Sequence, residues 1–324
     1  MIITRTPFRV SLAGGGSDIA SYYRSGFGAA VSATINKYMY ITVNRRFDRT
    51  IRLSYSRTET AAHADELQHG IVRECMKMVG IDTGIEITSI ADIPAGTGLG
   101  SSSSFTVGLL NSLYTYIGQQ RSAHELAVKA CEIEIDALGA PIGKQDQFAA
   151  AYGGLNYYRF NADESVEYEK IGLGEMEADR LGSKLMLFFT GTKREANEIL
   201  ADQQRYAPRN RESLDFIRDE AARLRGELSE NGVTAAIGAS LHAGWLRKKS
   251  LSEAISNPDI DRRYGDALGA GAAGGKLLGA GGGGFLLIYC DEQFQDGVRE
   301  AVGLREVDFH ITRHGSRVVF IGDE

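Results

Sequence analysis

Eleven residues of the sequence, Pro94 to Ser104, combine glycines and serines in a pattern that suits phosphate binding. They stand between a predicted strand at 85–90 and a predicted helix whose apolar positions recur every four residues from Phe105 to Ile117. Backbone N–H groups in the first turn of a helix lack intrahelical partners and lie at the positive end of the helix dipole. Glycines let the backbone approach an anion, and serine hydroxyls can cap the helix or reach a Mg²⁺ ion held by phosphates. The pattern therefore indicates a site for a nucleotide triphosphate.

Alternative explanations of this stretch differ in how much of it they cover. A Walker A loop requires a lysine before its final serine or threonine, and no lysine occurs between Pro94 and Ser104. A glycine and serine turn that caps an ordinary helix would account for a lone Gly-x-Gly-x-x-Ser pattern equally well. The eleven residues together are more specific than that pattern, which favours the phosphate site.

Charged residues that bear on phosphate chemistry stand in two other stretches. Residues 6–18 place Arg9 on a predicted strand and Asp18 after three glycines, and residues 132–147 carry several carboxylates, including Asp146. Taken singly, each has a structural explanation: an arginine at a strand edge, an aspartate in a turn, and a helix N-cap. None of these residues is assigned to chemistry on its own.

A third glycine-rich stretch, residues 275–285, has four consecutive glycines ahead of an apolar strand. By itself it suits a tight turn with close backbone packing. Together with residues 6–18 and 94–104 it resembles the three motifs of the GHMP kinases, the family named for galactokinase, homoserine kinase, mevalonate kinase and phosphomevalonate kinase. The three matches stand in the family's order and span nearly the whole chain. The resemblance implies an ATP-dependent kinase in which Gly281 and Gly282 belong to a loop that folds over the phosphate-binding loop.

The resemblance also implies roles for the first motif. Arg9 would stabilise the transferred phosphoryl group or the ionised base. Asp18 would accept hydrogen bonds from substrate hydroxyls, a contact that suits the vicinal hydroxyls of a sugar, with Gly15, Gly16 and Ser17 beside it in the substrate site. Galactokinases have a Glu-His pair where this chain has Gly15 and Gly16, which counts against galactose as the substrate.

The second motif is implied to surround the phosphates of ATP and to contribute to a Mg²⁺ site. Its phosphate-binding residues are Gly96, Gly98, Leu99, Gly100, Ser101, Ser102 and Ser103. Ser102 would also bind Mg²⁺, and because the neighbouring serines are equivalent on sequence grounds, this choice rests on the family alone. Glu134 would be the second Mg²⁺ ligand. Helical phase does not distinguish Glu132 from Glu134, so that choice also rests on the resemblance.

Asp146 is implied to be the catalytic carboxylate. Phosphoryl transfer needs positioning and charge neutralisation, which one Mg²⁺ ion and one carboxylate beside the attacking hydroxyl can supply. Asp146 would take the proton of that hydroxyl, and Lys144 or Arg9 would keep its carboxylate ionised.

Within the family, several stretches most resemble the bacterial kinases of D-glycero-D-manno-heptose 7-phosphate. These stretches are residues 9–18, 33–38, 54–59, 101–104 and 143–147. The resemblance implies transfer of the ATP γ-phosphate to the C1 hydroxyl, which gives the 1,7-bisphosphate. Lys193 and Arg194 are the candidates for binding the 7-phosphate, with a solvated basic pair as the plainer alternative.

Two other functions stay open on the sequence. A kinase similar to fucokinases would phosphorylate an unphosphorylated sugar at C1, and its first motif is similar. A sensor that binds sugar and nucleotide without catalysis is a role found among galactokinase relatives. The retention of Ser102, Glu134 and Asp146 argues against the sensor.

Composition limits the class of protein. A chain of 324 residues with 43% hydrophobic and 24% charged residues is expected to form a globular protein of two domains. The formal net charge of −6 gives no basic surface for nucleic acid. No apolar run approaches a signal peptide or a membrane span, which predicts a cytoplasmic protein with no membrane partner. The expected partners are ATP, Mg²⁺ and a sugar phosphate, with homodimer formation left open.

The fold that the resemblance implies is α+β with two domains. Residues 1–165 would form an N-terminal domain similar to a protein of the small ribosomal subunit, with the ATP-binding loop. Residues 166–324 would form a ferredoxin-like domain, and the active site would lie in the cleft between the two. We place the adenine near residues 55–70.

Apolar patterns predict the elements that position these residues. Strands are expected at 2–12, 29–35, 39–43, 50–55 and 185–189, with an Asn-Lys turn at 36–37, and a terminal strand pair at 307–311 and 317–321. A capping box at Ser122 and Glu125 predicts a helix that ends at Gly139. Arg247, Lys248 and Lys249 would complement the C-terminus of a helix over 233–249 in preference to binding an anion.

Overall fold

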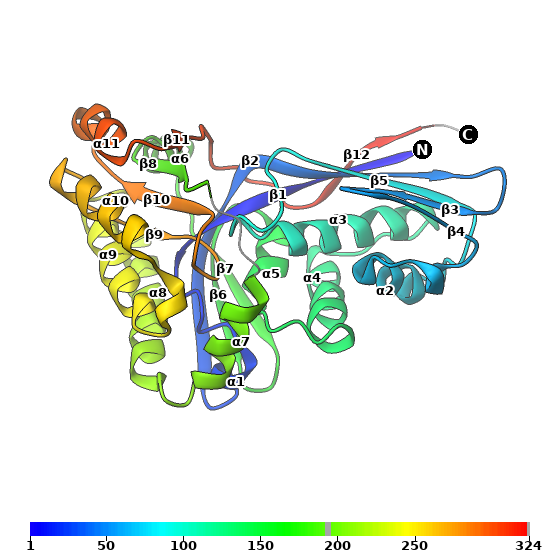
Figure 1. Ribbon diagram of the computed structural model, residues 1–324, viewed down its shortest axis with the longest axis horizontal. Helices are drawn as coiled ribbons and strands as arrows, with labels where there is room; N and C mark the ends of the chain where they lie inside the picture. Colours follow the sequence, from blue (N-terminus) through cyan, green and yellow to red (C-terminus); the bar gives the residue numbers. More distant parts are fainter. Residues whose placement is uncertain (192–195, 323–324) are drawn as a thin grey trace.

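The computed structural model describes residues 1–191 and 196–322 and has two β-sheets with helices packed against them (Figure 1). In these residues the larger sheet has eight strands, in the order β12-β1-β2-β5-β3-β4, with β6 paired to β2 and β7 to β6. The smaller sheet has four antiparallel strands, in the order β11-β8-β10-β9. The structure confirms the predicted α+β class.

The elements have the following bounds. The larger sheet is formed by β1 (Ile2–Ala13), β2 (Phe27–Arg45), β3 (Ile51–Ser54), β4 (Thr58–Ala61), β5 (Ile85–Ala91), β6 (Leu155–Asn161), β7 (Val166–Lys170) and β12 (Arg317–Ile321). The smaller sheet is formed by β8 (Leu185–Phe189), β9 (Gly274–Leu277), β10 (Phe285–Tyr289) and β11 (Arg305–Glu306). The helices are α1 (Ala20–Tyr23), α2 (Gly70–Val79), α3 (Ser101–Tyr116), α4 (Ala123–Cys131), α5 (Gln145–Tyr152), α6 (Glu175–Ser183), α7 (Ala196–Tyr206), α8 (Arg211–Glu230), α9 (Ala236–Lys249), α10 (Pro258–Gly269) and α11 (Gln295–Val302), with a π-helix η2 at Glu132–Ala137 and 3₁₀ turns η1 (Ala64–Glu66), η3 (Glu253–Ile255) and η4 (Glu292–Phe294).

The long strand β2 replaces the turn predicted at residues 36–37. Along β1, Pro7 pairs with Tyr38 but Phe8 pairs with Ile35, so two residues of β2 have no partner on β1. This is a β-bulge, which bends the strand without ending it. The backbone N–H of Asn36 donates to the carbonyl oxygen of His310 at 2.9 Å, and the backbone N–H of His310 donates to the Asn36 side chain at 2.7 Å. The Asn-Lys pair that predicted a turn therefore forms a β-bulge, and His310, near the other end of the chain, stabilises it.

The predicted terminal strand pair is also wrong. β12 pairs with β1, with Ile2 opposite Ile321, which brings the two ends of the chain side by side (Figure 1). β7 pairs with β6 in the same sheet. Two segments from the predicted C-terminal domain, β7 and β12, therefore belong to the larger sheet. The division into domains at residue 165 remains a proposal. If sheet membership defines the boundary, the boundary lies after Lys170, the last residue of β7.

The strand predicted at 185–189 is confirmed as β8, and with β10 it separates two apolar cores. Side chains of a strand point alternately to its two faces. On β10, Leu287 packs into the large cluster with β1, β2 and α3, whereas Leu286 packs into a second cluster with Trp245 of α9. Leu187 of β8 lies opposite Leu287. The smaller sheet is thus buried on both faces and joins the two cores.

No helix within the described ranges is long and apolar enough to cross a membrane. The three cysteines, Cys75, Cys131 and Cys290, are free and buried.

The burial of Leu287 in the larger core predicts a large effect on stability. We expect Leu287→Ala to lower the free energy of unfolding by about 2–5 kcal/mol, because the side chain is fully buried and its removal leaves a cavity. The matched control is Leu246→Ala on α9, where the leucine is 48% exposed and the change should stay within about 0.5 kcal/mol. Urea denaturation of both variants tests this, and equal losses would contradict the assignment of Leu287 to the core.

Candidate active site

The glycine-rich loop leads directly into α3, as predicted. Gly96, Gly98 and Gly100 all have positive φ, and Gly100 is the residue before the first helical turn. The four serines that follow have different surroundings. Ser104 is buried and donates to the carbonyl oxygen of Pro7 at 2.9 Å, whereas the Ser102 hydroxyl donates to Oε1 of Glu134 at 2.6 Å. The structure therefore distinguishes serines that the sequence left equivalent.

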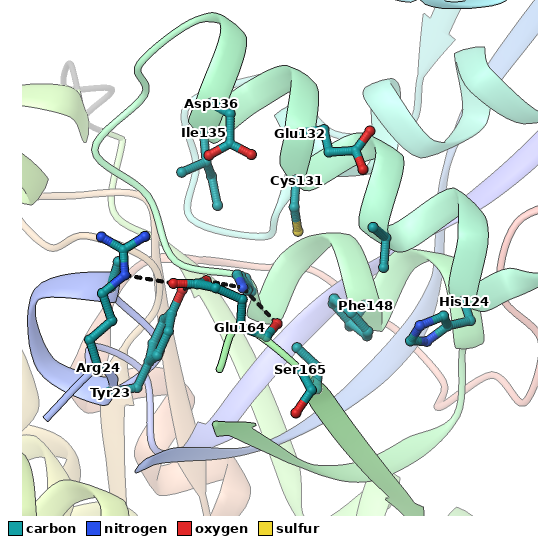
Figure 2. Close-up of a pocket in the computed structure, with 14 residues that line it drawn as sticks. Tyr23, Arg24, His124, Cys131, Glu132, Ile135, Asp136, Phe148, Glu164 and Ser165 are labelled. Atoms are coloured by element: carbon teal, nitrogen blue, oxygen red, sulfur yellow. Dashed lines mark hydrogen bonds and ion pairs between the residues drawn. The ribbon is translucent and has the colours of Figure 1, made fainter. Parts of the chain in front are cut away.

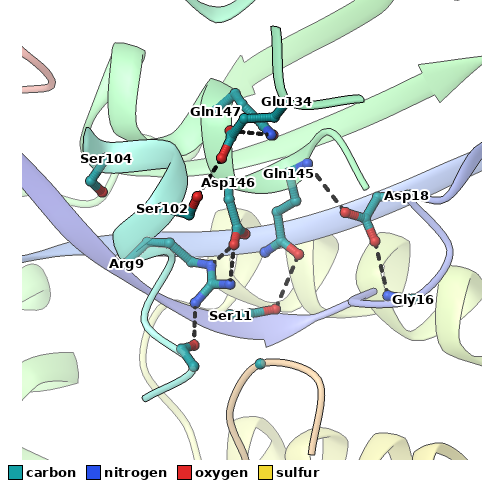
Figure 3. Close-up of polar contacts among 12 residues, drawn as sticks. Arg9, Ser11, Gly16, Asp18, Ser102, Ser104, Glu134, Gln145, Asp146 and Gln147 are labelled. Atoms are coloured by element: carbon teal, nitrogen blue, oxygen red, sulfur yellow. Dashed lines mark hydrogen bonds and ion pairs between the residues drawn. The ribbon is translucent and has the colours of Figure 1, made fainter. Parts of the chain in front are cut away.

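A bidentate ion pair between Arg9 and Asp146 lies beside this loop (Figure 3). Nε of Arg9 donates to Oδ1 of Asp146 at 2.7 Å, and Nη2 donates to Oδ2 at 2.6 Å. Nη1 donates to the carbonyl oxygen of Gly98 at 2.6 Å, so the same guanidinium holds the loop. Arg9 is 5% exposed, whereas the side chain of Asp146 is 27% exposed. The carboxylate is therefore fixed by a buried cation and remains accessible from the cavity.

A π-helix gives Glu132 and Glu134 different surroundings. α4 begins at the capping box of Ser122, where both predicted hydrogen bonds form, and then changes to the π-helix η2. The wider turn leaves Glu132 exposed and buries Glu134 toward α3. Gln147 Nε2 donates to Oε2 of Glu134 at 2.8 Å. Burial raises the pKa of Glu134, while hydrogen bonds from Ser102 and Gln147 oppose that rise.

Asp18 is held by backbone N–H groups at the end of the first glycine turn (Figure 3). The N–H of Gly16 donates to Oδ1 at 2.9 Å, and the N–H of Gln145 donates to Oδ2 at 3.2 Å. A Cβ at Gly143 would lie 2.0 Å from Oδ2 of Asp18, so only glycine allows this approach. Burial and the nearby charge of Asp146 raise the pKa of Asp18, against the effect of the two hydrogen bonds.

Ser17 differs from the substrate-binding role predicted for it. Its hydroxyl is fully buried and donates to the carbonyl oxygens of Gly14 and Ala29 at 2.9 and 2.8 Å. It also accepts from the N–H of Ala29 at 3.0 Å. Ser17 therefore ties the glycine turn to β2 and does not line the neighbouring cavities.

The third glycine stretch packs its backbone directly on the phosphate loop. A Cβ at Gly279 would lie 2.5 Å from Cα of Gly98, and a Cβ at Gly284 would lie 2.4 Å from the carbonyl oxygen of Thr97. Gly281 lines the larger cavity, whereas the N–H of Gly282 donates to the carbonyl oxygen of Ile255 at 2.9 Å. The predicted contact between the two loops is present.

Two cavities meet at Arg9 and Asp146. The larger, of about 460 Å³, is lined by the glycine loop, Ser101 to Ser103, Glu134 and an apolar part that includes Ile71, Leu138 and Pro141. The smaller, of about 90 Å³, is lined by Gly15, Gly16, Asp18, Ser11, Gln145, Gln203 and Lys248. Arg9, Asp146, Gly279 and Ala280 line both. Residues 55–70, where the sequence placed adenine, do not line the larger cavity.

Lys248 lines the small cavity, although the sequence analysis assigned it to the C-terminus of a helix and not to a binding site. It lies in the last turn of α9, but it is 6% exposed and its Nζ donates to the carbonyl oxygen of Gly279 at 2.5 Å. Because residues 247–249 are all basic, the sequence did not indicate that the middle one, Lys248, is buried. The predicted phosphate ligands Lys193 and Arg194 lie outside the described residues.

Lys144 does not contribute to Asp146 in the way that the sequence suggested. It pairs with Glu164 at 2.5 Å in a separate cavity of about 350 Å³ (Figure 2). Tyr23 and Arg24 also donate to the Glu164 carboxylate, each at 2.6 Å. Burial alone would raise the pKa of Glu164, but these hydrogen bonds lower it to about 2. Arg9 is therefore the cation that contacts Asp146.

The arrangement suits phosphoryl transfer. A carboxylate fixed by a buried arginine lies between a glycine-lined cavity and a smaller polar one, and such transfer depends on positioning and charge stabilisation. Within the described part of the chain, no group of three or more His, Cys, Asp or Glu side chains could hold a metal by itself.

Comparison with known proteins gives consistent matches. Residues 66–154 match the family model described as the GHMP kinases N terminal domain. The chain is 30% identical to the D-glycero-alpha-D-manno-heptose 7-phosphate kinase of Campylobacter jejuni, over 97% of each protein. A mevalonate kinase of Methanothermobacter thermautotrophicus is 27% identical over 81% of this chain and 83% of the relative. The crystal structure of a D-glycero-D-manno-heptose 1-phosphate kinase from Bacteroides thetaiotaomicron has a TM-score of 0.82 and 25% identity, covering 100% of both chains.

The identity over nearly the full length, the family model and the order of the three motifs agree with the geometry of the site. The chain therefore belongs to the GHMP kinase family and is an ATP-dependent phosphotransferase.

Proposed function

We propose that this protein transfers the γ-phosphate of ATP to the C1 hydroxyl of D-glycero-D-manno-heptose 7-phosphate. The observation that carries the proposal is the Arg9–Asp146 pair at the junction of the two cavities. The likeness to the heptose 7-phosphate kinase of Campylobacter jejuni supports the choice of a heptose phosphate.

The proton of the attacking hydroxyl goes to Asp146. The sugar occupies the smaller cavity with its C1 hydroxyl next to this carboxylate, and Asp18 accepts hydrogen bonds from other hydroxyls. Arg9 fixes the orientation of the Asp146 carboxylate through two hydrogen bonds. Its guanidinium also lies where it stabilises the negative charge of the transferred group.

The phosphates of ATP lie along the loop from Gly96 to Ser103, where the glycines expose backbone N–H groups. The adenine lies toward the apolar part of the larger cavity, against Ile71, Leu138 and Pro141. This placement uses the cavity walls and replaces the segment 55–70 suggested by the sequence.

Ser102 and Glu134 fit the requirements of a Mg²⁺ ion that also binds phosphates. Their oxygens lie 2.6 Å apart, and Mg²⁺ in kinases takes few protein ligands because phosphates and water supply the rest. When bound, the ion would neutralise charge on the β- and γ-phosphate oxygens. Gln147 orients the Glu134 carboxylate from the opposite side.

The first experiment measures Mg²⁺-dependent ATP consumption with a panel of sugars. The panel is D-glycero-D-manno-heptose 7-phosphate, the unphosphorylated heptose, mannose 6-phosphate, fucose and galactose. Turnover of the heptose 7-phosphate, with the product identified by NMR as the 1,7-bisphosphate, is expected. Turnover of an unphosphorylated sugar alone would move the function to a kinase similar to fucokinases. Binding without any turnover would favour a sensor.

Asp146→Asn should abolish most of the activity while the protein stays folded. We expect kcat to fall by about 10²- to 10⁴-fold, because the amide cannot accept the proton. The matched control is Asp136→Asn, an exposed carboxylate of η2 that lines a different cavity. ATP affinity should be similar in both variants, and a kcat of Asp146→Asn near that of the control would refute the role of Asp146.

Glu134→Gln should raise the Mg²⁺ requirement. Because the amide is a weaker ligand than the carboxylate, we expect the Mg²⁺ concentration for half-maximal activity to rise by at least about tenfold. Glu132→Gln, two residues away and exposed, serves as the control and should leave that concentration unchanged. Titration of Mg²⁺ at fixed ATP separates the two variants, and a larger effect at Glu132 would reverse the assignment.

A further inference from the structure

Two lysines are buried beneath the first glycine turn without a counter-ion among the described residues. Lys248 of α9 is 6% exposed and Lys276 of β9 is 5% exposed. Each donates to a backbone carbonyl oxygen, Lys248 to Gly279 at 2.5 Å and Lys276 to Leu12 at 3.4 Å. Within residues 1–191 and 196–322, neither forms an ion pair. A buried ammonium group without a carboxylate partner is costly, which indicates that an anion completes this site.

Lys248 is the lysine that faces the smaller cavity. It lines that cavity together with Gly15, Asp18 and Gln145, whereas Lys276 does not. A Cβ at Gly15 would lie 4.0 Å from Nζ of Lys248 and 3.2 Å from the Ser11 hydroxyl. A side chain at residue 15 would therefore occupy the space in front of the Lys248 ammonium group. The glycine keeps that space free for a substrate group.

A second unsatisfied donor lies on the same wall. Gln145 is 2% exposed, and its Nε2 has no hydrogen-bond partner, while its Oε1 accepts from the Ser11 hydroxyl at 3.3 Å. Buried donors without a partner are rare in folded proteins, and a bound ligand is one way in which such a donor is satisfied. The amide lies between Asp146 and Asp18 (Figure 3). The wall thus offers an ammonium group and an amide donor to oxygen atoms of the substrate.

We propose that the smaller cavity contains the subsite for the phosphate of the sugar phosphate, that Lys248 is the residue that recognises this phosphate, and that Gln145 donates to an adjacent oxygen of the same substrate. This rests on the proposed function, since it assumes that the sugar is the acceptor. It assigns the basic group of the pocket to α9 in place of residues 193 and 194. Asp18 accepts from sugar hydroxyls on the other side of the cavity.

The electrostatic surroundings of Lys248 are compatible with this role. Burial lowers the pKa of Lys248 to about 8; the Arg9 charge acts in the same direction, and the charges of Asp18 and Asp146 oppose it. Lys276 is the other titratable group near it, and burial and the Lys248 charge lower the pKa of Lys276 well below the usual value. Lys248 is thus largely protonated at neutral pH and loses its proton above about pH 8. A bound phosphate dianion would favour the protonated form.

The decisive experiment compares phosphorylated and unphosphorylated heptose in a variant of Lys248. For Lys248→Met we expect kcat/KM for the heptose 7-phosphate to fall by about 10- to 100-fold, because this is the stabilisation that a hydrogen bond to a charged group usually provides. The kcat/KM for the unphosphorylated heptose should change by less than about threefold, because this sugar has no phosphate for Lys248 to contact and substitutions away from a specific contact have small effects. Lys249→Met is the matched control, because Lys249 is the next residue, is partly exposed and pairs with Asp261 at 2.9 Å. It should leave both substrates unchanged.

The outcomes separate the inference from the proposed function. If the wild-type protein turns over the heptose 7-phosphate and Lys248→Met loses both heptoses equally, the phosphate subsite is wrong and the kinase function stands. If the wild-type protein turns over only unphosphorylated sugars, the proposed function and the subsite both fail. A selective loss for the phosphorylated sugar supports both.

A measurement on the wild-type protein covers the case in which the Lys248 variant does not fold. kcat/KM reports ionisations of the free enzyme, so the value for heptose 7-phosphate should fall as the pH rises through about 8. The unphosphorylated heptose shares ATP, Asp146 and the loops, and its profile should lack this additional fall. Coincident profiles for the two sugars would overturn the inference.

Discussion

The site depends on the close approach of two glycine-rich backbones, one from each half of the chain. Gly279 packs on Gly98 at a distance that excludes even one carbon atom on either residue, and Gly284 packs on Thr97 in the same way. Because the backbones touch, Lys248 can reach the carbonyl oxygen of Gly279 while Arg9 reaches that of Gly98. Residues from α9 and from β1 therefore line the same small cavity. A side chain at either glycine would separate the two halves and enlarge the space in which the sugar must meet ATP.

Buried charge is the second constraint on this fold. Arg9, Asp18, Glu134 and Lys248 are each less than a tenth exposed, and burial of charged groups is unfavourable unless partners compensate for the lost water. Arg9 is compensated by Asp146 and by a carbonyl oxygen, and Glu134 by a serine and a glutamine. Lys248 and the amide of Gln145 are left with open hydrogen-bonding capacity. The uncompensated groups lie together on one wall, so the protein alone does not complete the site.

The sequence predicted elements whose signals are local. The strand predicted from the apolar run of β8 and the capping box of α4 were both confirmed, because each depends on neighbouring residues alone. α10 was missed although Asn257 caps it and Pro258 opens it, a signal that was present in the sequence. The bulge of β2 and the pairing of β12 with β1 depend on partners hundreds of residues away, which no local pattern contains.

The resemblance to a family selected Arg9 and the acidic and glycine residues of the site, but no sequence signal selected Lys248. Arg9, Asp146 and Glu134 were selected by resemblance, and physical reasoning could not separate Glu134 from Glu132 because it assumed an α-helix where a π-helix forms. Lys248 stands between Arg247 and Lys249 in a run that suits a solvated helix end, and only the packing of α9 against the third glycine loop shows which of the three points inward.

Four consecutive residues, 143–146, contact both Asp18 of the first glycine turn and Arg9 of β1. Gly143 packs against Asp18, Lys144 pairs with Glu164, and the N–H of Gln145 donates to Asp18. Asp146 then meets Arg9. Glu164 has a positive φ of 70°, an unfavourable conformation for a residue with a side chain, and its carboxylate binds three donors in the cavity of Figure 2. Gly143 and Gln145 both contact Asp18, while Glu164 anchors Lys144 and Arg9 anchors Asp146, so this short segment fixes the position of Asp146 relative to Asp18.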